Sequence, residues 1–269
     1  MTAAKSGQIY VGVGGWVFEP WRETFYPKTL SQKDELNYAS RQVTSIEINA
    51  TYYGSQKPES FARWRDDTPE GFKFSVKGPR FATNRRVLAE SAESVARFLG
   101  SGVTELGDKL GAINWQFMAT KKYDAGDFED FLELLPATQD GLPLQHAIEV
   151  RSATFVDPGF VALAARYGVA VVLTAHAEFP LIAAATAPFA FVRLMGTSED
   201  EKNGYSDTEL DLWVSRLRTL AAGGLPEDFP PVAGAPAGTT APRDVYAYVI
   251  DGFKPHNPAA AMALIARLG

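Results

Sequence analysis

Hydrophobic residues recur along this chain in short runs, most of which alternate with polar residues, and this two-residue period is typical of β-strands. The clearest run spans residues 46–51, where Ile46 and Ile48 fall on one side while Glu47, Asn49 and Thr51 fall on the other. Polar residues on an otherwise buried strand indicate a site. The eight predicted strands span residues 9–14, 46–51, 72–77, 112–117, 147–151, 169–174, 189–194 and 245–250.

Helical patterns separate these runs. Asp157 and Pro158 predict a capped helix start with proline in the first turn, and the segment 206–209 predicts a capping box. Gly102 is a weak point in the apolar stripe of residues 95–110. Repeated strand–helix alternation predicts an α/β fold, and eight repeats close best as a TIM-barrel-like (β/α)8 domain, a closed parallel sheet surrounded by helices, over residues 1–269. The predicted helices span residues 32–41, 58–65, 95–110, 128–135, 158–167, 206–220 and 258–268.

One segment, residues 221–242, is rich in proline, glycine and alanine. It follows a predicted helix and precedes a predicted strand, so it belongs at the N-terminal face of a barrel, away from the usual catalytic face. We expect a flexible insertion there. Ordering against a partner is the alternative.

Composition narrows the function. With 269 residues and 46% hydrophobic content the chain can build a sizeable core, and a net charge of −6 argues against non-specific nucleic-acid binding. No cysteine is present, which excludes disulfides and cysteine nucleophiles. Residues 1–6 lack the apolar core of a secretion signal, and no apolar stretch is long enough to span a bilayer, so we expect a cytoplasmic protein with no membrane partner.

Inward-facing polar residues gather at the C-terminal ends of the predicted strands, where barrel enzymes keep their chemistry. A purely structural ion network is one explanation, yet hydrophobic replacement of buried ion pairs is often better by ~1–4 kcal/mol. We therefore favour a ligand or catalytic site. The inward set comprises Gly12, Gly14, Glu47, Asn49, Lys77, Asn114, Gln116, Glu149, Arg151, Thr174, His176, Arg193 and Asp251.

The leading hypothesis is acid–base catalysis on a small polar, anionic ligand. Glu47 and Glu149 are the predicted catalytic residues, because a partly desolvated carboxyl group can have a pKa near neutral. Lys77, Arg151 and Arg193 are expected to hold a carboxylate or phosphate. The other predicted ligand-binding residues are Asn49, Gln116 and Asp251, with Trp16 and Tyr52 as aromatic cover.

The same positions resemble the YecE-like family, also known as domain of unknown function 72. The resemblance implies a TIM-barrel-like fold but no catalytic role, because the family has no settled activity. Asn84 and Met195 stand where that family often has histidines, so activity in this chain could be altered or lost. The matching motifs are Gly12–Trp16 with Trp21, Phe25–Pro27, Glu47–Tyr53, Phe72–Lys77, Leu110–Gln116, Glu149–Arg151, Val192–Leu194 and Val245–Tyr248.

A metal-dependent phosphoesterase or isomerase is the second hypothesis, with a set of four possible ligands. The interleaved basic residues argue against it, because they repel a cation. The sequence identifies no cofactor, and residues 12–15 lack the full dinucleotide fingerprint. The four possible metal ligands are Glu47, Glu149, His176 and Asp251.

A non-catalytic binding protein is the third hypothesis. A small-molecule ligand is the expected partner. Nucleic acid is the less favoured one, with Arg80, Arg85 and Arg86 as its basic rim. Retaining glycoside hydrolysis is excluded in its usual barrel form, because strands four and seven offer Gln116 and Arg193 in place of carboxylates.

Overall fold

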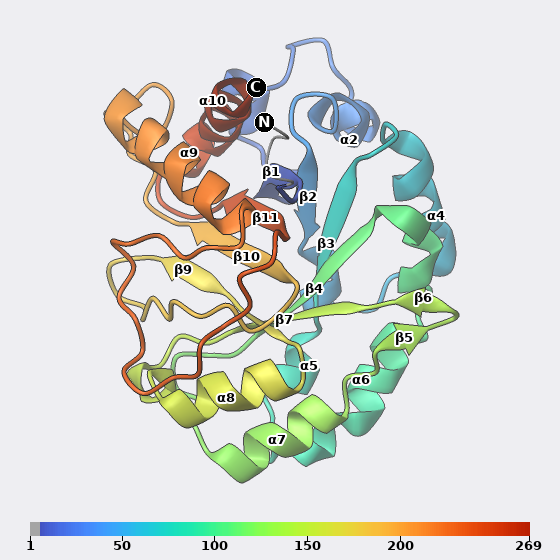
Figure 1. Ribbon diagram of the computed structural model, residues 1–269. Coiled ribbons are helices and arrows are strands. Elements are labelled where there is room, and N and C mark those ends of the chain that lie inside the picture. The colour runs from blue at the N-terminus through green and yellow to red at the C-terminus, as the bar shows by residue number, and fades with distance from the viewer. Residues whose placement is uncertain (1–5) are drawn as a thin grey trace.

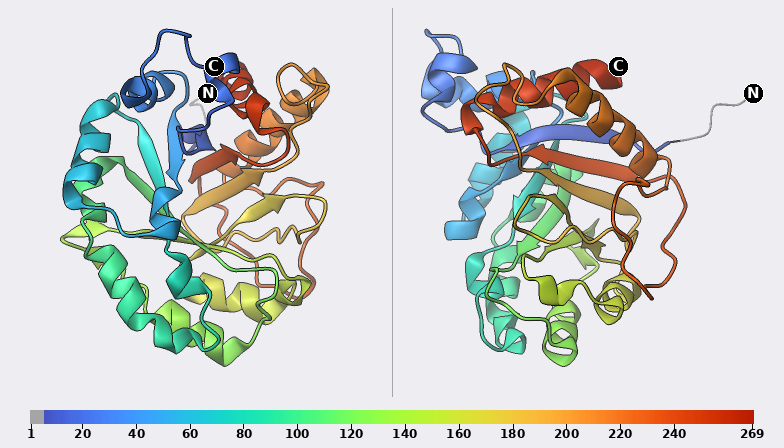
Figure 2. Two further views of the ribbon diagram at one scale, coloured as in Figure 1. Left: turned by 180° about the vertical axis from the view of Figure 1, so that it is seen from behind. Right: turned by 90° about the vertical axis from the view of Figure 1, so that its left-hand side faces the viewer.

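The computed structural model describes residues 6–269, and the first five residues of the segment considered above for a secretion signal lie outside them. The strands form one parallel sheet in the order β8–β7–β4–β3–β2–β1–β11–β10–β9, inside an outer layer of helices (Figures 1 and 2). Their bounds are β1 Ile9–Gly14, β2 Ser45–Ile48, β3 Lys73–Lys77, β4 Leu110–Gln116, β7 Gln145–Glu149, β8 Ala170–Val171, β9 Leu173–Ala175, β10 Phe189–Leu194 and β11 Asp244–Val249.

The sheet closes through a broken sixth strand. β8 pairs with β7 and β9 pairs with β10, and Val172 alone separates β8 from β9. The two ends of the sheet are therefore consecutive pieces of one segment, so the ring has eight strand positions. The predicted TIM-barrel-like fold is confirmed.

The helices follow the predicted alternation, with one break. Gly102 has a φ of 94°, so the stripe 95–110 divides into α6, Ala92–Leu99, and a 3₁₀ turn, Val103–Lys109. The sequence analysis missed the short hairpin of β5 (Thr138–Gln139) and β6 (Leu142–Pro143). The helices are α1 Trp21–Thr24, α2 Glu35–Ala39, α3 Ala50–Tyr53, α4 Pro58–Asp67, α5 Arg80–Thr83, α6 Ala92–Leu99, α7 Ala125–Glu133, α8 Pro158–Arg166, α9 Asp207–Ala221 and α10 Asn257–Leu268.

Both predicted helix caps are present. The side chain of Asp157 accepts from the backbone N–H groups of Gly159 and Phe160 at the start of α8. Ser206 and Glu209 form the reciprocal capping box of α9. These local contacts fix where the helices begin without help from the barrel.

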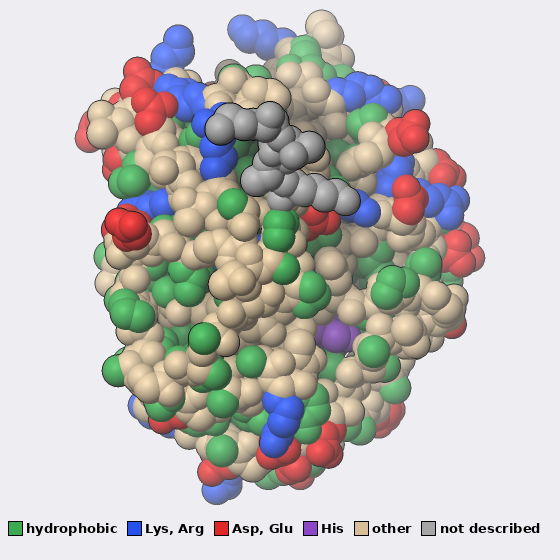
Figure 3. Space-filling model, viewed as in Figure 1, with side chains coloured by type: hydrophobic (Ala, Val, Ile, Leu, Met, Phe, Trp, Pro, Cys, Tyr) green, Lys and Arg blue, Asp and Glu red, His purple; other side chains and the backbone are tan. Residues whose placement is uncertain are grey.

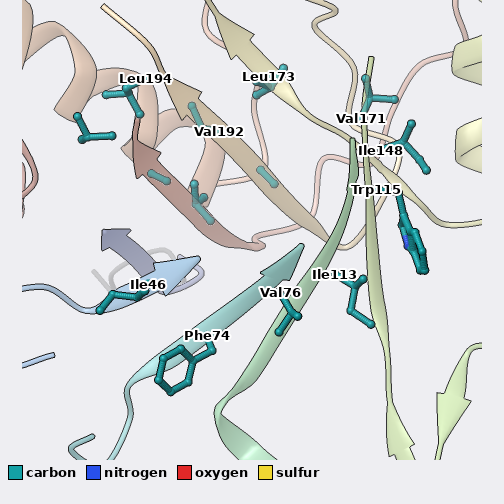
Figure 4. Packing of buried hydrophobic residues seen from close by; sticks show 14 of the residues in the cluster. Ile46, Phe74, Val76, Ile113, Trp115, Ile148, Val171, Leu173, Val192 and Leu194 are labelled. Atoms are coloured by element: carbon teal, nitrogen blue, oxygen red, sulfur yellow. The ribbon is translucent and has the colours of Figure 1, made fainter. Parts of the chain in front are cut away.

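Two hydrophobic cores divide the interior. The larger one lies between sheet and helices, and Figure 4 shows its side chains, Trp115 and Phe74 among them, pointing away from the barrel axis. The second fills the inside of the barrel and includes Phe191, Tyr246 and Tyr248. The Tyr248 hydroxyl lies 2.6 Å from a serine hydroxyl on β2 and 2.6 Å from another on β3. Apolar packing thus closes part of the interior, and the charged groups collect toward the C-terminal strand ends.

Two strands end two or more residues earlier than predicted. β2 ends at Ile48, because Asn49 is already helical and the Thr51 hydroxyl donates to the carbonyl of Lys77 at 2.7 Å. β7 ends at Glu149, which leaves Arg151 in the following loop. Asn49 and Arg151 therefore lie beyond the strand ends, where the two-residue alternation of a strand no longer sets the direction of a side chain.

The segment 221–242 contacts the residues before β10. Phe229 and Val232 are buried, and the backbone N–H of Thr239 donates to the carbonyl of Ala185 at 3.2 Å. The flexibility of segment 221–242 stays a prediction.

The side of the molecule that faces the viewer in Figure 3 carries the N-terminal strand ends, and charged side chains gather mainly at the margin of this side. Within residues 6–269 no helix has the length and apolar character needed to cross a membrane.

Candidate active site at the C-terminal strand ends

Three buried charges meet inside the barrel. Arg193, on β10, places Nη2 2.5 Å from Oε1 and 2.7 Å from Oε2 of Glu47, on β2. Its Nε lies 2.7 Å from Oε2 of Glu149, on β7, an ion pair by distance although the angle is too poor for a hydrogen bond. Asn114, on β4, donates from one Nδ2 to both carboxylates, at 3.1 and 3.0 Å. Four strands thus hold one connected ionic cluster.

Arg151 extends this cluster toward solvent. Its Nε and Nη2 donate to Oε1 of Glu149 at 2.9 and 2.7 Å, and its guanidinium lies 4.6 Å from the ring centre of Phe179. Burial would raise the pKa of Glu149, but Arg193 and then Arg151 outweigh it and hold that pKa below its usual value. This direction is opposite to the raised carboxyl pKa that the sequence analysis expected.

Lys77, at the end of β3, differs from the two arginines of the cluster. Within residues 6–269 its Nζ makes no hydrogen bond or ion pair, and it lies 4.7 Å above the ring centre of Tyr52. Burial, and next the positive charge of Arg193, lowers the pKa of Lys77 to about 8. The side chain can therefore exchange a proton near neutral pH.

A pocket of about 290 Å³ opens over this cluster. Six predicted site residues line it, namely Glu47, Asn49, Lys77, Arg151, Arg193 and Asp251. Glu47 and Glu149 are both fully buried, so Glu47 borders the floor of the pocket and Glu149 reaches it through its arginine partners. The other lining residues are Gly14, Val17, Phe18, Trp21, Tyr53, Met195, Ile250, Lys254 and Asn257.

Three predicted ligand-binding residues do not line this pocket among residues 6–269. Trp16 packs edge-on against Trp64, Tyr52 lies beside Lys77, and Gln116 is buried at the end of β4. For the two aromatic residues the reason is the loop geometry after β1 and β2. This geometry turns other aromatic side chains, from Phe18, Trp21 and Tyr53, toward the opening.

Sequence reasoning also missed Lys254 and Asn257, which line the pocket from the segment after β11. No alternation marks them, because they lie in a 3₁₀ turn and at a helix start. Of the two family departures, Met195 lines the pocket, whereas Asn84 is exposed at the end of α5.

Other hollows exist among residues 6–269. One of about 280 Å³ is lined by residues of α5, of α6 and of the segment between them, with Phe81, Arg97 and Arg85 among them. Glu93 is the carboxylate that lines it, and it is exposed and paired with Arg97. We place the site where buried ions meet, because desolvated charges are costly unless a function uses them.

The predicted set of four metal ligands does not assemble. Among residues 6–269 no group of three or more His, Asp and Glu side chains is arranged to hold a metal ion. His176 instead accepts from the backbone N–H of Glu178 at 3.1 Å and stacks on Phe179 at 4.4 Å. Arg193, between Glu47 and Glu149, occupies the space where their oxygens would converge.

Comparison with known proteins then decides the family. The sequence model described as "Protein of unknown function DUF72" matches residues 10–269. The chain belongs to the DUF72 family. The Escherichia coli UPF0759 protein YecE is 26% identical over 152 residues, which are 56% of this chain and 51% of that protein. The Bacillus subtilis UPF0759 protein YunF is 36% identical over 69 residues, which are 26% of this chain and 23% of that one. The chain thus matches about half the length of YecE and less of YunF.

Solved structures agree on the fold. A DUF72 family protein of Thermotoga maritima has a TM-score of 0.74 at 21% identity and covers 97% of this chain and 99% of its own. One of Enterococcus faecalis has a TM-score of 0.70 at 16% identity, over 97% and 95%. A D-psicose 3-epimerase has a TM-score of 0.53 at 13% identity, and the match covers 96% of this chain and 97% of that one. At such identities these likenesses show the barrel fold alone.

Proposed function

We propose that this DUF72 protein is an enzyme that binds a small anionic ligand, through a carboxylate or phosphate group, and performs acid–base chemistry on it in the pocket at the C-terminal strand ends. The charge of the pocket carries this proposal. Four cationic side chains line it against two carboxylates, and the buried Glu149 still leaves one positive charge in excess. A small anion would balance that charge, and the volume of about 290 Å³ is at the lower end of the range for ligand pockets, roughly 300–1,000 Å³.

Arg151 is the proposed anion anchor. Glu149 takes its Nε and Nη2, so the guanidinium is held in one orientation, and within residues 6–269 its Nη1 has no protein acceptor. Asn49 and Lys254 line the same pocket and supply further donors. A preoriented arginine binds a carboxylate or phosphate at a smaller entropic cost than a free one.

Glu47 is the proposed proton-transfer group, because it lines the pocket while its partners Arg193 and Asn114 fix its position. Glu149 contributes to the same chemistry from beneath the pocket, because its carboxylate holds Arg151 and Arg193 in place. Substrate atoms would meet Glu47 and Arg151 from the open side of the pocket. Proton transfer by a positioned group of this kind contributes roughly 10²–10⁴-fold to a rate.

Anion binding can be tested without knowing the substrate. Inorganic phosphate and acetate are titrated by calorimetry into the wild-type protein, Arg151→Gln and, as a matched control, Arg97→Gln, whose exposed guanidinium pairs with Glu93. Loss of a charged hydrogen bond is worth about 1.5–3 kcal/mol, so Arg151→Gln should weaken binding roughly 10- to 100-fold. Equal affinity in all three proteins would remove Arg151 as the anchor and with it the proposed site.

Proton transfer needs a separate test. A panel of small carboxylates is incubated with protein in D₂O and followed by NMR for exchange of C–H protons, in the wild type and in Glu47→Gln. The proposal expects exchange that Glu47→Gln abolishes. Anion binding with no exchange for any compound would instead support the non-catalytic binding protein.

A further inference from the structure

Lys77 has a feature that anion binding does not use. Lys77 and Lys254 are the two lysines of the pocket wall, and neither Nζ has an acceptor within residues 6–269, whereas Arg151 and Arg193 are both bound to carboxylates. Lys254 is exposed, whereas Lys77 is half-buried. Lys77 lies at the last position of β3, and the ring of Tyr52 supports its ammonium from one side. An amine in such a position is accessible to a ligand and is not neutralised by the protein.

The surroundings favour the neutral amine. Burial and two arginines oppose the ammonium form, while Glu47 and Glu149 favour it, and the pKa of Lys77 settles at about 8. At about pH 8 roughly half of the side chains then carry a free lone pair, against less than ~1% for an ordinary lysine. The titratable groups around this amine are Glu47 on β2, Tyr52 and Tyr53 on α3, Glu149 on β7, Arg151 after it, Arg193 on β10, and Asp251 and Lys254 after β11.

We propose that Lys77 is a covalent catalytic residue that forms an imine with the carbonyl group of a small oxo acid, whose carboxylate is held by Arg151. This inference rests on the proposed function, because it uses the same pocket and the same anion anchor. It narrows the ligand to one class, compounds that combine an aldehyde or ketone with a carboxylate. A lysine near other cations is a suitable nucleophile for this reaction.

The reaction balances without any other reagent. The Nζ lone pair attacks the carbonyl carbon, a C–N bond forms, and the π electrons move to the oxygen, which takes a proton while the nitrogen loses one, giving a neutral carbinolamine. The hydroxyl then takes a second proton, the C–O bond breaks with release of water as the C=N bond forms, and the nitrogen loses its second proton. Amine and carbonyl thus become imine and water. Glu47, which also lines the pocket, is placed to supply and recover these protons.

Two properties of the pocket match an oxo acid. Its excess of one positive charge, which counts Lys77 as an ammonium and returns when the imine is protonated, suits one carboxylate, and its volume of about 290 Å³ has room for a ligand of a few carbon atoms. A sugar without a carboxylate would leave the positive charge unbalanced. A phosphate without a carbonyl would bind but would have no atom for Lys77 to attack.

Reduction traps the imine. The wild-type protein is incubated with pyruvate or glyoxylate at about pH 8 and treated with cyanoborohydride, which delivers hydride to the imine carbon and leaves a stable secondary amine. Intact mass and peptide mapping then locate the adduct. Variant Lys77→Arg keeps the charge but cannot form an imine. Variant Lys73→Arg changes the other lysine of β3, whose Nζ donates to the carbonyl of Asp108 outside the pocket.

The expected result is one adduct, at Lys77, formed at least about tenfold faster than at Lys73, lost in Lys77→Arg and kept in Lys73→Arg. Similar labelling of both lysines would overturn the inference, because Lys77 would then be an ordinary amine. No adduct at Lys77 in a protein that still binds inorganic phosphate through Arg151 would also overturn it and leave the proposed function standing. If the wild-type protein neither binds inorganic phosphate nor forms the reduced adduct at Lys77, the proposed function is overturned as well.

Discussion

Replacement of Arg193 by methionine tests the buried ion cluster most directly. The guanidinium is 2% exposed and contacts both oxygens of Glu47 and one oxygen of Glu149. Without it Glu149 keeps Arg151, but Glu47 keeps only the amide of Asn114. The variant therefore contains one buried carboxylate without a cation.

Breaking a buried pair in this way costs about 3–5 kcal/mol, because the remaining charge stays desolvated. We expect the free energy of unfolding of Arg193→Met to fall by that amount, measured by urea denaturation with circular dichroism near pH 7. The matched control is Arg97→Met, which breaks an exposed pair with Glu93 and should cost only about 0.3–0.5 kcal/mol. If Arg193→Met fails to fold, Arg193→Lys keeps one charge and should show a smaller loss of the same sign.

Dependence on pH separates this explanation from simple loss of packing. The pKa of Glu149 lies below its unfolded value, so in the wild type its stabilisation is present above the unfolded pKa and is lost as pH falls through the folded one. In Arg193→Met the unpaired carboxylate costs less once protonated, so the deficit relative to wild type should shrink between about pH 7 and about pH 5. A deficit below about 1 kcal/mol near pH 7, or one that grows on acidification, would refute the buried-cluster reasoning.

Three further changes have defined expectations. Gly12→Ala should destabilise the fold by about 3 kcal/mol or more in denaturant, because its Cβ would lie 1.7 Å from the carbonyl oxygen of Ser45, whereas Gly54→Ala meets nothing within 4 Å and should be near neutral. Tyr248→Phe should cost about 1–2 kcal/mol, since it removes a hydroxyl that two buried serines share, and an unchanged unfolding midpoint would contradict this bonding. Ser206→Ala should cost about 1 kcal/mol by the loss of the α9 capping box, and faster hydrogen exchange confined to the first turn of α9 would be its local signature.

The sequence alone determined the architecture of this protein. Short apolar runs, most of them alternating, placed the eight barrel positions, and caps such as Asp157 and Ser206 marked helix starts that the structure confirms. These signals are readable because strand period, capping and proline at a helix start depend on contacts within a few residues. The same alternation put Glu47, Lys77 and Arg193 on the inner side of their strands, where they meet.

Only the tertiary structure decided how those groups combine. The tilt and stagger of strands far apart in sequence bring both Glu47 and Glu149 to Arg193 and leave Lys77 without such a partner among residues 6–269. Loops decided the rest: Asn49 and Arg151 lie beyond the strand ends, and Lys254 joins the pocket. The two-residue period of a strand ends with the strand itself. A sequence pattern can therefore place charged residues around a barrel, but it cannot say which of them form ion pairs.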